Sequence, residues 1–326
     1  MFVDHRKDPY SRNLFDAGTQ EYEEAVLEYF AALAGASPGE VHGYVAASPR
    51  DALLNGLAMA RRGLPEPSVY LCEQTRYDIV QICELLGMNR VVVRTRPDGT
   101  MDAEDLRLQT RMRRGTGAVV VAICGTPLRG AIDNVAELRA VAAASGPVHV
   151  HVDAAAGGLA AAHSNQVPPW SLAHGAHSIT LSGHSLLGLP VPAGISLVRR
   201  EPMPPTLSGI TLPDHLVIGS RSGLAALLLW TRLRSLGRAG VAAMVARCQD
   251  VAAYALEQFE AAGVSPEHFP GSLTVTFERP PHWVLDKWRL PYTRDLAQIV
   301  MTGPMTRTTV DEFAADLSAA RQGAAA

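Results

Sequence analysis

Residues 148–158 read VHVHVDAAAGG and are the part of the sequence that decides the fold. Valine alternates with polar residues over the first six positions, a pattern typical of a β-strand. The run ends in a carboxylate, Asp153, which is followed by alanines and glycines. In an open parallel sheet, functional groups collect where strands end and loops begin. The stretch therefore predicts a central strand that places Asp153 at a functional edge.

Short β-rich runs alternate with helical patterns along residues 20–200. We expect strands at 68–72, 90–95, 118–124, 148–153, 178–182 and 195–199. This alternation predicts an α/β fold with a mainly parallel sheet covered by helices on both faces. We expect a short arm over residues 1–20, a large α/β domain over 21–237 and a small C-terminal α+β domain over 238–326.

The composition excludes several classes of partner. The net charge is −3 at pH 7 and the basic residues form no cluster, so neither nucleic acid nor an anionic membrane is expected as a partner. The four cysteines are widely spaced without a CxxC pair, which argues against a zinc site or a disulfide framework. No apolar run reaches the roughly 18 residues of a membrane span, and the charged start is unlike a signal peptide. We therefore expect a cytoplasmic protein.

Lysine is almost absent. Of 29 lysines and arginines, only Lys7 and Lys287 are lysine. Lysine forms Schiff bases with carbonyl cofactors and substrates, whereas arginine stays protonated and cannot. Lys7 lies in the polar start of the chain and Lys287 near its end, so neither is expected to be catalytic.

Three predicted strands end in motifs that can be compared with known families. They read CGTPLRGAID at 124–133, HVDAA at 151–155 and SGHS at 182–185. Together with GYV at 43–45 and GSR at 219–221, they resemble the group II pyridoxal-phosphate-dependent amino-acid decarboxylases, especially the bacterial histidine decarboxylases. The resemblance implies the fold type I, aminotransferase-like architecture of that family, and pyridoxal phosphate (PLP) as its cofactor.

The resemblance gives roles to several residues that this sequence retains. In the family, the aspartate at the position of Asp153 pairs with the ring nitrogen of PLP. Thr126, Ser182, His184 and Arg221 also stand at cofactor-site positions of the family. We take Asp153 and His184, with Ser185, as the candidate catalytic residues.

Other positions depart from the family pattern. Ser185 stands where the family motif SxHK has the lysine that is linked to PLP, so no covalent attachment is expected there. The glycine-rich turn that receives the phosphate is replaced by AASPRDA at 46–52, which introduces Arg50 and a proline. Arg76 aligns with a family histidine that stacks on the ring. These changes also argue against noncovalent binding of PLP.

The retained and altered residues lead to one main hypothesis and two alternatives. The motif at 219–221, which approaches the neighbouring subunit's cofactor in the family, is intact, while groups that serve the chain's own cofactor are changed. The main hypothesis is a non-autonomous or regulatory subunit that pairs with a competent decarboxylase-like chain. The alternatives are a PLP-independent enzyme acting on a small anionic ligand in the former cofactor pocket, and a decarboxylase that binds PLP noncovalently. A homodimer or heterodimer is expected in each case.

Simpler roles compete for the same residues. His149, His151 and Asp153 share one strand face at a spacing that can suit a metal, but the family match already accounts for two of them, so no metal is expected. Ser185 and His184 could form a nucleophile and base, although adjacent residues rarely point at each other. Asp153 could instead be a structural carboxylate that accepts backbone N–H groups.

The arginines have two interpretations. Arg50, Arg76 and Arg221 could line the pocket for an anionic ligand, or they could seal an unused pocket through ordinary salt bridges. Cys124 follows a strand near the expected site, where a buried cysteine is usually an inert small hydrophobe.

Overall fold

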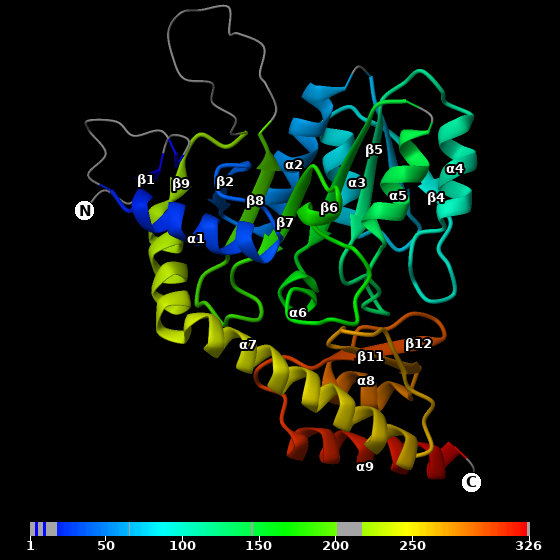
Figure 1. Cartoon of the computed structure of the whole chain (residues 1–326). Coiled ribbons are helices and arrows are strands. Elements are labelled where there is room, and N and C mark those ends of the chain that lie inside the picture. Colours follow the sequence, from blue (N-terminus) through cyan, green and yellow to red (C-terminus); the bar gives the residue numbers. More distant parts are fainter. Residues whose placement is uncertain are drawn as a thin grey trace, which may run out of the picture.

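The fold was examined in a computed structural model of the chain (Figure 1). The structure describes residues 4–5, 9–10, 18–64, 66–144, 146–200 and 217–324. None of the helices within these ranges is long and apolar enough to cross a membrane.

A seven-stranded sheet forms the centre of the molecule. From one edge to the other its strands are β2 (Val41–Ala46), β8 (Gly194–Arg199), β7 (Ser178–Ser182), β6 (Val148–Ala154), β5 (Ala118–Ile123), β3 (Ser68–Cys72) and β4 (Asn89–Val93). The neighbours from β7 to β4 are parallel, whereas β8 runs antiparallel to both β7 and β2. The predicted mainly parallel sheet is confirmed, and the predicted strand ends shift by only one or two residues.

β2 is not among the predicted strands because its sequence, VHGYVA, contains a glycine that interrupts the β pattern. The structure explains that glycine. A Cβ atom on Gly43 would lie 2.0 Å from the carbonyl oxygen of Ser196 on the neighbouring strand. Only glycine permits this close approach of the two backbones.

Helices cover both faces of the sheet. The ones flanking it are α1 (Gln20–Leu33), α2 (Pro49–Gly63), α3 (Tyr77–Leu85), α4 (Ala103–Arg111), α5 (Val135–Ala143) and the short α6 (Gly158–Ala161). The apolar side chains of α2 and α3 share one core with β3 and β5, while α1, α4 and α5 belong to a second core on the opposite face. This two-sided burial is what the alternation of strands and helices predicted.

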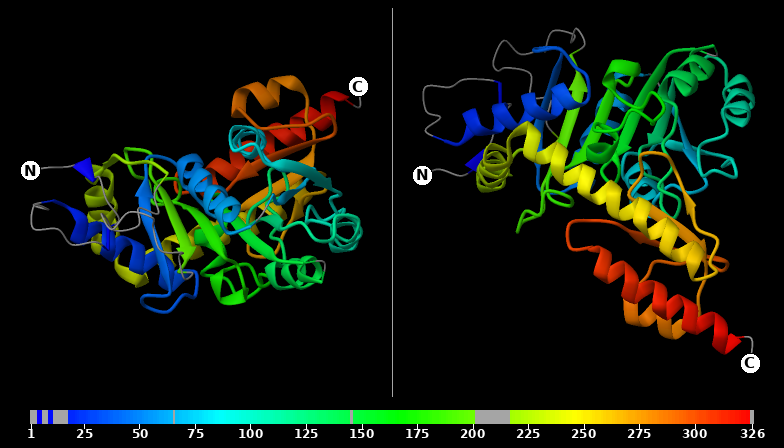
Figure 2. Two further views of the ribbon diagram at one scale, coloured as in Figure 1. Left: turned by 90° about the horizontal axis from the view of Figure 1, so that it is seen from above. Right: turned by 60° about the horizontal axis from the view of Figure 1, so that its bottom comes forward.

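The C-terminal part has its own core and a small antiparallel sheet of β10 (Glu267–His268), β11 (Thr274–Glu278) and β12 (Leu296–Val300). Helices α8 (His282–Trp288) and α9 (Arg307–Ala324) pack with this sheet. The long helix α7 (Gly223–Ala261) connects it to the large sheet (Figure 2). Gly237, with φ 61° and ψ 176°, interrupts the helical backbone of α7.

The carboxyl ends of the central strands face this C-terminal part. Gly130, in the loop after β5, has φ +61°, and a Cβ atom there would lie 2.1 Å from the hydroxyl oxygen of Ser272. The carbonyl of Leu128, in the same loop, accepts a hydrogen bond from the hydroxyl of Thr276 in β11. Glycine at 130 therefore lets the site-forming loop pack tightly against β11.

Candidate functional site

Asp153 lies near the carboxyl end of β6 at the centre of the candidate site. Its side chain is buried, and the Ala155 N–H donates to its Oδ1 at 3.2 Å. Burial raises the pKa of the Asp153 carboxyl, and the Arg76 guanidinium opposes this rise without cancelling it. The structure thus gives Asp153 one backbone hydrogen bond, as the simpler interpretation expected, and also a cationic neighbour.

Arg76 supplies the positive charge opposite Asp153. It follows β3, and its guanidinium is held by Asp78, with Nη2–Oδ2 at 2.6 Å and Nε–Oδ1 at 3.1 Å. The same Nη2 lies 3.8 Å from Oδ2 of Asp153. Burial disfavours the charged guanidinium, yet Asp153 and Asp78 raise its pKa above the usual value. Arg76 therefore stays charged beside Asp153.

A hydroxyl-rich turn follows β7 at the same edge. Ser182 Oγ lies 2.8 Å from Ser185 Oγ and accepts from the backbone N–H of Ser185 at 3.1 Å. His184 Nδ1 lies 3.0 Å from the Ala193 carbonyl oxygen and 3.3 Å from Ser182 Oγ. The Ala193 N–H donates to the same Nδ1 at 3.2 Å, so one donor and one acceptor of Ala193 both lie within hydrogen-bond distance of this nitrogen. The Ala193 backbone therefore holds the His184 ring beside the two serine hydroxyls.

The start of α2 forms another wall of the candidate site. The Ser48 hydroxyl accepts from the Asp51 N–H at 3.2 Å, so this helix N-terminus is capped by its own residues. Arg50 donates to Gln81 Oε1 at 3.0 Å on the exposed side. Asp51 places a carboxylate in the first turn, where it disfavours a second anion. The N–H of Asp51, in the segment that replaces the phosphate turn, is therefore already bonded to Ser48.

Arg221 does not join the other arginines. Its side chain is 1% exposed and lies 3.3 Å from Oε2 of Glu23, with its guanidinium 5.0 Å from the ring centroid of Tyr44. Of the two interpretations of the arginines, Arg221 follows the one in which they form ordinary salt bridges. The buried Glu23 attracts it into the protein interior, because a buried guanidinium needs a carboxylate partner.

Glu23 was not identified from the sequence. It also accepts from the Val45 N–H at 2.8 Å and contacts Nδ1 of His5 at 2.5 Å. Through these contacts the cluster joins β1 (Asp4–His5), α1, β2 and β9 (Arg221–Ser222). No sequence pattern distinguishes Glu23 from the other acidic residues of α1, because its partners are remote in the chain.

The remaining predicted residues also have clear local roles. The Thr126 hydroxyl accepts from the Ala131 N–H at 2.9 Å and closes the loop after β5. Burial raises the pKa of the Cys124 thiol well above its usual value, which makes it unreactive. Within the described residues no group of histidine, cysteine and acidic side chains has the geometry to hold a metal.

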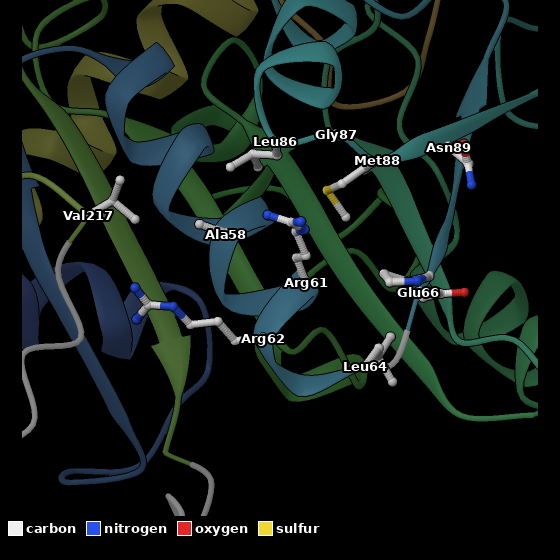
Figure 3. A pocket seen from close by; sticks show the side chains of 11 residues that line it. Ala58, Arg61, Arg62, Leu64, Glu66, Leu86, Gly87, Met88, Asn89 and Val217 are labelled. Carbon is white, nitrogen blue, oxygen red and sulfur yellow. The ribbon is translucent and has the colours of Figure 1, made fainter. Parts of the chain in front are cut away.

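A separate surface pocket of about 760 Å³ lies at the opposite end of α2 (Figure 3). Arg61 extends toward Leu86 and Met88, while Arg62 is turned toward Val217. The pocket is lined by the end of α2 and by loops that precede β3 and β4. It contains none of the candidate site residues.

Comparisons with known proteins identify the family. Residues 57–265 match the model of the pyridoxal-dependent decarboxylase conserved domain. The chain belongs to this family. It is 31% identical to a histidine decarboxylase of Mesorhizobium japonicum over 95% of this chain and 85% of that protein. It is 30% identical to the histidine decarboxylase of Klebsiella aerogenes over 95% of this chain and 84% of the relative.

Solved structures of decarboxylases share the fold. L-methionine decarboxylase from Streptomyces sp.590 superposes with a TM-score of 0.84 at 20% identity, over 98% of this chain and 86% of the other. Glutamate decarboxylase from Lactobacillus brevis gives a TM-score of 0.77, also at 20% identity, over 96% and 82% of the two chains. These similarities confirm the predicted fold type I architecture.

The main functional hypothesis, a non-autonomous subunit that completes a partner's site, is wrong. The chain is similar from end to end to decarboxylases that are named as enzymes in their own right. Its structural basis also fails, because Arg221 is buried against Glu23 of its own chain instead of being presented to a neighbour.

The residues of the site fit the family cofactor in part. A buried carboxylate at the position of Asp153 suits a protonated ring nitrogen. Ser185 offers a hydroxyl and no amine, and Lys287 lies in α8, where it pairs with Asp316 at 2.6 Å. Lys7 lies outside the described residues. The residues therefore suit the ring nitrogen of PLP, whereas Ser185 does not suit a covalent link and Asp51 in the first turn of α2 does not favour the phosphate.

Proposed function

We propose that this protein is an amino-acid decarboxylase of the PLP-dependent family that holds its cofactor without a covalent bond. The observation that carries the proposal is the buried Asp153 carboxylate at the end of β6, in a chain similar to histidine decarboxylases over 95% of its length. PLP, when bound, supplies a ring that accepts the electron pair left behind as carbon dioxide departs.

The residues of this chain would divide the remaining tasks. Asp153 holds a proton at the ring nitrogen, because a carboxylate stabilises the protonated form. The hydroxyls of Ser182 and Ser185 offer hydrogen bonds at the edge where the family lysine would stand. Arg76 must move away from Asp153 when the cofactor binds, since two cations cannot share one buried carboxylate favourably. The substrate is proposed to be an L-amino acid, with histidine tested first.

Binding and turnover test the proposal directly. PLP is titrated into the purified chain and followed by its absorbance, and carbon dioxide release is then measured with histidine and other amino acids. We expect saturable binding that dialysis reverses, and about tenfold weaker binding in Asp153→Asn. The absence of saturable binding in the wild-type chain would contradict the proposal.

Covalent attachment provides a second test. Borohydride treatment followed by mass spectrometry should leave no PLP on the wild-type chain, whereas Ser185→Lys should retain one PLP per chain. Ser185→Met is the matched control, because it adds a long side chain without an amine. Ser185 is exposed, so neither change disturbs the core. Attachment to the wild-type chain would show that a different amine serves the site.

A second candidate function is favoured by one contact. Arg76 already places a positive charge 3.8 Å from Asp153, where a ring nitrogen would lie. This arrangement suits a PLP-independent enzyme acting on a small anionic ligand. Arg76→His, which restores the family residue, separates the two proposals. It should strengthen PLP binding under the first, and it should weaken binding of small carboxylates under the second.

A further inference from the structure

The loop that follows β5 contains a strained turn. Leu128 has φ +73°, and the N–H of Arg129 donates to the carbonyl of Pro127 at 2.9 Å. A hydrogen bond across one residue of positive φ defines the rarer, strained type of γ-turn. A residue with a Cβ atom keeps such a backbone conformation only where the surrounding structure imposes it. The turn therefore needs a contact that holds it.

The small antiparallel sheet presents hydroxyl groups to this turn. Along β11, Val275 and Phe277 belong to the C-terminal core, so Thr274 and Thr276 lie on the opposite face of the strand. The Thr276 hydroxyl donates to the carbonyl of Leu128. The alternation of threonine with apolar residues in β11 thus directs one face to its own core and the other to the loop after β5.

A single peptide group makes both bonds of the turn. The peptide unit between Leu128 and Arg129 supplies the N–H that bonds to Pro127 and the carbonyl that bonds to Thr276. In a trans peptide these two groups point in opposite directions. When the N–H points into the turn, the carbonyl therefore points outward to β11. A rotation of this peptide unit would break both bonds at once, so the Thr276 hydroxyl selects the strained orientation.

Other contacts between the loop and the small sheet are weaker candidates for this role. Arg129 pairs with Glu267 of β10, but their side chains are 20% and 53% exposed, and exposed ion pairs contribute little. Gly130 packs against Thr274 without a polar contact. Thr276 is 1% exposed, and a buried hydrogen bond is costly to lose. Thr276 is therefore the main hold on the turn.

The other end of the loop is joined to the strand end that carries Asp153. The N–H of Cys124 donates to the carbonyl of Asp153 at 2.9 Å, and the carbonyl of Cys124 accepts from the Gly157 N–H at 2.9 Å. A Cβ atom on Gly125 would lie 2.7 Å from the nitrogen of Gly157. The first residues of the loop thus lie directly on the backbone around Asp153.

Thr126 connects the two ends. Its carbonyl accepts from the Gly130 N–H at 2.8 Å, and its hydroxyl accepts from the Ala131 N–H at 2.9 Å. Residues on both sides of Thr126 are therefore fixed, on one side to the small sheet and on the other to the strand end. A change in the turn displaces Gly130 and, through these bonds, Thr126.

We propose that Thr276 is a positioning residue of the site: it holds the strained turn at 127–129 and thereby fixes the loop that adjoins Asp153. The inference rests on the proposed function only for the use of this loop in binding PLP. Its consequence is that the small sheet shapes the site although Thr276 touches neither substrate nor cofactor.

Amide hydrogen exchange of the chain without PLP tests the hold on the turn. The protection factor of the Arg129 N–H is measured by NMR. Thr276→Val removes the donor and should lower this factor about tenfold, since the turn opens more often. Thr276→Ser keeps a hydroxyl and should stay near the wild type. Thr110→Val is the matched control: it removes an equally buried hydroxyl, which bonds to Leu106 in α4, and should leave Arg129 unchanged.

Leu128→Gly separates a strained turn from an ordinary one. The Leu128 side chain belongs to none of the apolar cores of the described residues, so glycine removes little packing. Glycine adopts positive φ readily, and relief of strain should raise the Arg129 protection factor about threefold. In an unstrained turn the added backbone freedom would lower it instead. Combined with Thr276→Val, Leu128→Gly should restore part of the lost protection.

Titration with PLP, followed by absorbance, tests the consequence for the site. Thr276→Val should bind PLP severalfold more weakly, because only molecules with a closed turn are competent. Thr276→Ser should bind like the wild type, and Leu128→Gly added to Thr276→Val should recover part of the affinity. A variant that merely loosened the small sheet would gain nothing from Leu128→Gly.

Several outcomes would overturn the inference. They are an unchanged Arg129 protection factor in Thr276→Val, an equal loss in Thr276→Ser, or a loss caused by Leu128→Gly. If Thr276→Val does not fold, Leu128→Gly alone decides. Should the wild type bind PLP and Thr276→Val bind it equally well, the positioning role fails and the proposed function stands. Should the exchange results hold in a chain that never binds PLP, only the proposed function fails.

Discussion

The neutral, buried state of His151 makes a quantitative prediction about stability. Burial lowers its pKa from the ordinary 6.5 to about 3. The unfolded chain therefore takes up a proton here below about pH 6.5, whereas the folded chain does not. The stability that the fold gains from a neutral His151 is complete above the pKa of this ring in the unfolded chain. It is lost as the pH falls below that value. At about pH 5 the loss amounts to about 2 kcal/mol, since each pH unit below 6.5 is worth about 1.4 kcal/mol.

His151→Gln isolates this contribution. The variant is expected to be less stable than the wild type at about pH 7.5, by about 1–3 kcal/mol, because it weakens the hydrogen bond between the imidazole and Ser178. At about pH 5 the deficit should shrink by about 2 kcal/mol, since glutamine does not titrate. Urea unfolding followed by tryptophan fluorescence measures the free energy of unfolding at both pH values.

The difference in unfolding free energy between the wild type and His151→Gln is compared at the two pH values. The contributions of groups that titrate in the same way in both proteins cancel in this difference. Asp133, for example, changes stability in the opposite direction, but it does so in both proteins. Gly237→Ala, which removes no titrating group, provides a control and should show the same difference from wild type at both pH values. If the deficit of His151→Gln does not change between about pH 7.5 and about pH 5, the ring is protonated in the fold or is reached by water, and the reasoning is refuted.

Three further predictions concern the free energy of unfolding measured by urea titration. Burial raises the pKa of Asp133 to about 6 although the N–H groups of Met101 and Ile123 donate to it. The stability of the wild type relative to Asp133→Asn should therefore fall by about 3 kcal/mol as the pH rises from about 4 to about 7. Arg221→Met leaves the Glu23 carboxylate buried without its ion pair and should cost about 3–5 kcal/mol, part of which Glu23→Gln recovers. Gly237→Ala meets no neighbouring atom but adopts φ +61°, so it should cost about 1–3 kcal/mol through backbone strain alone; a neutral effect would show that α7 can straighten there.

Local patterns in the sequence were sufficient to predict the sheet and its functional edge. Apolar runs that end in Asp153 or in the SGHS turn place these residues at strand ends, because the strand period and the following small residues are local features. β2 was missed for an equally physical reason: Gly43 serves a contact with Ser196, 153 positions later in the chain. Local preferences do not encode such a contact.

The partners of the charged residues could not be predicted in the same way. Arg221 was expected to face a neighbouring subunit, yet it pairs with Glu23, 198 residues earlier. Arg76 was identified as an altered position, but its approach to Asp153 depends on how the loop after β3 lies beside the end of β6. Ion pairs between remote segments follow from packing and not from spacing along the chain.

The sequence by itself determined that Asp153 lies at a strand end and that position 185 carries a hydroxyl and no amine, because these depend on residue identity and strand period. Only the tertiary structure decided what the polar face of β6 packs against, since both faces of the strand are buried. The alternation VHVHVD separates valines from polar residues but does not reveal the partners of the polar set. Here α2 covers the polar set, and the buried side chains of His149, His151, Ser178 and Thr180 hydrogen-bond to one another.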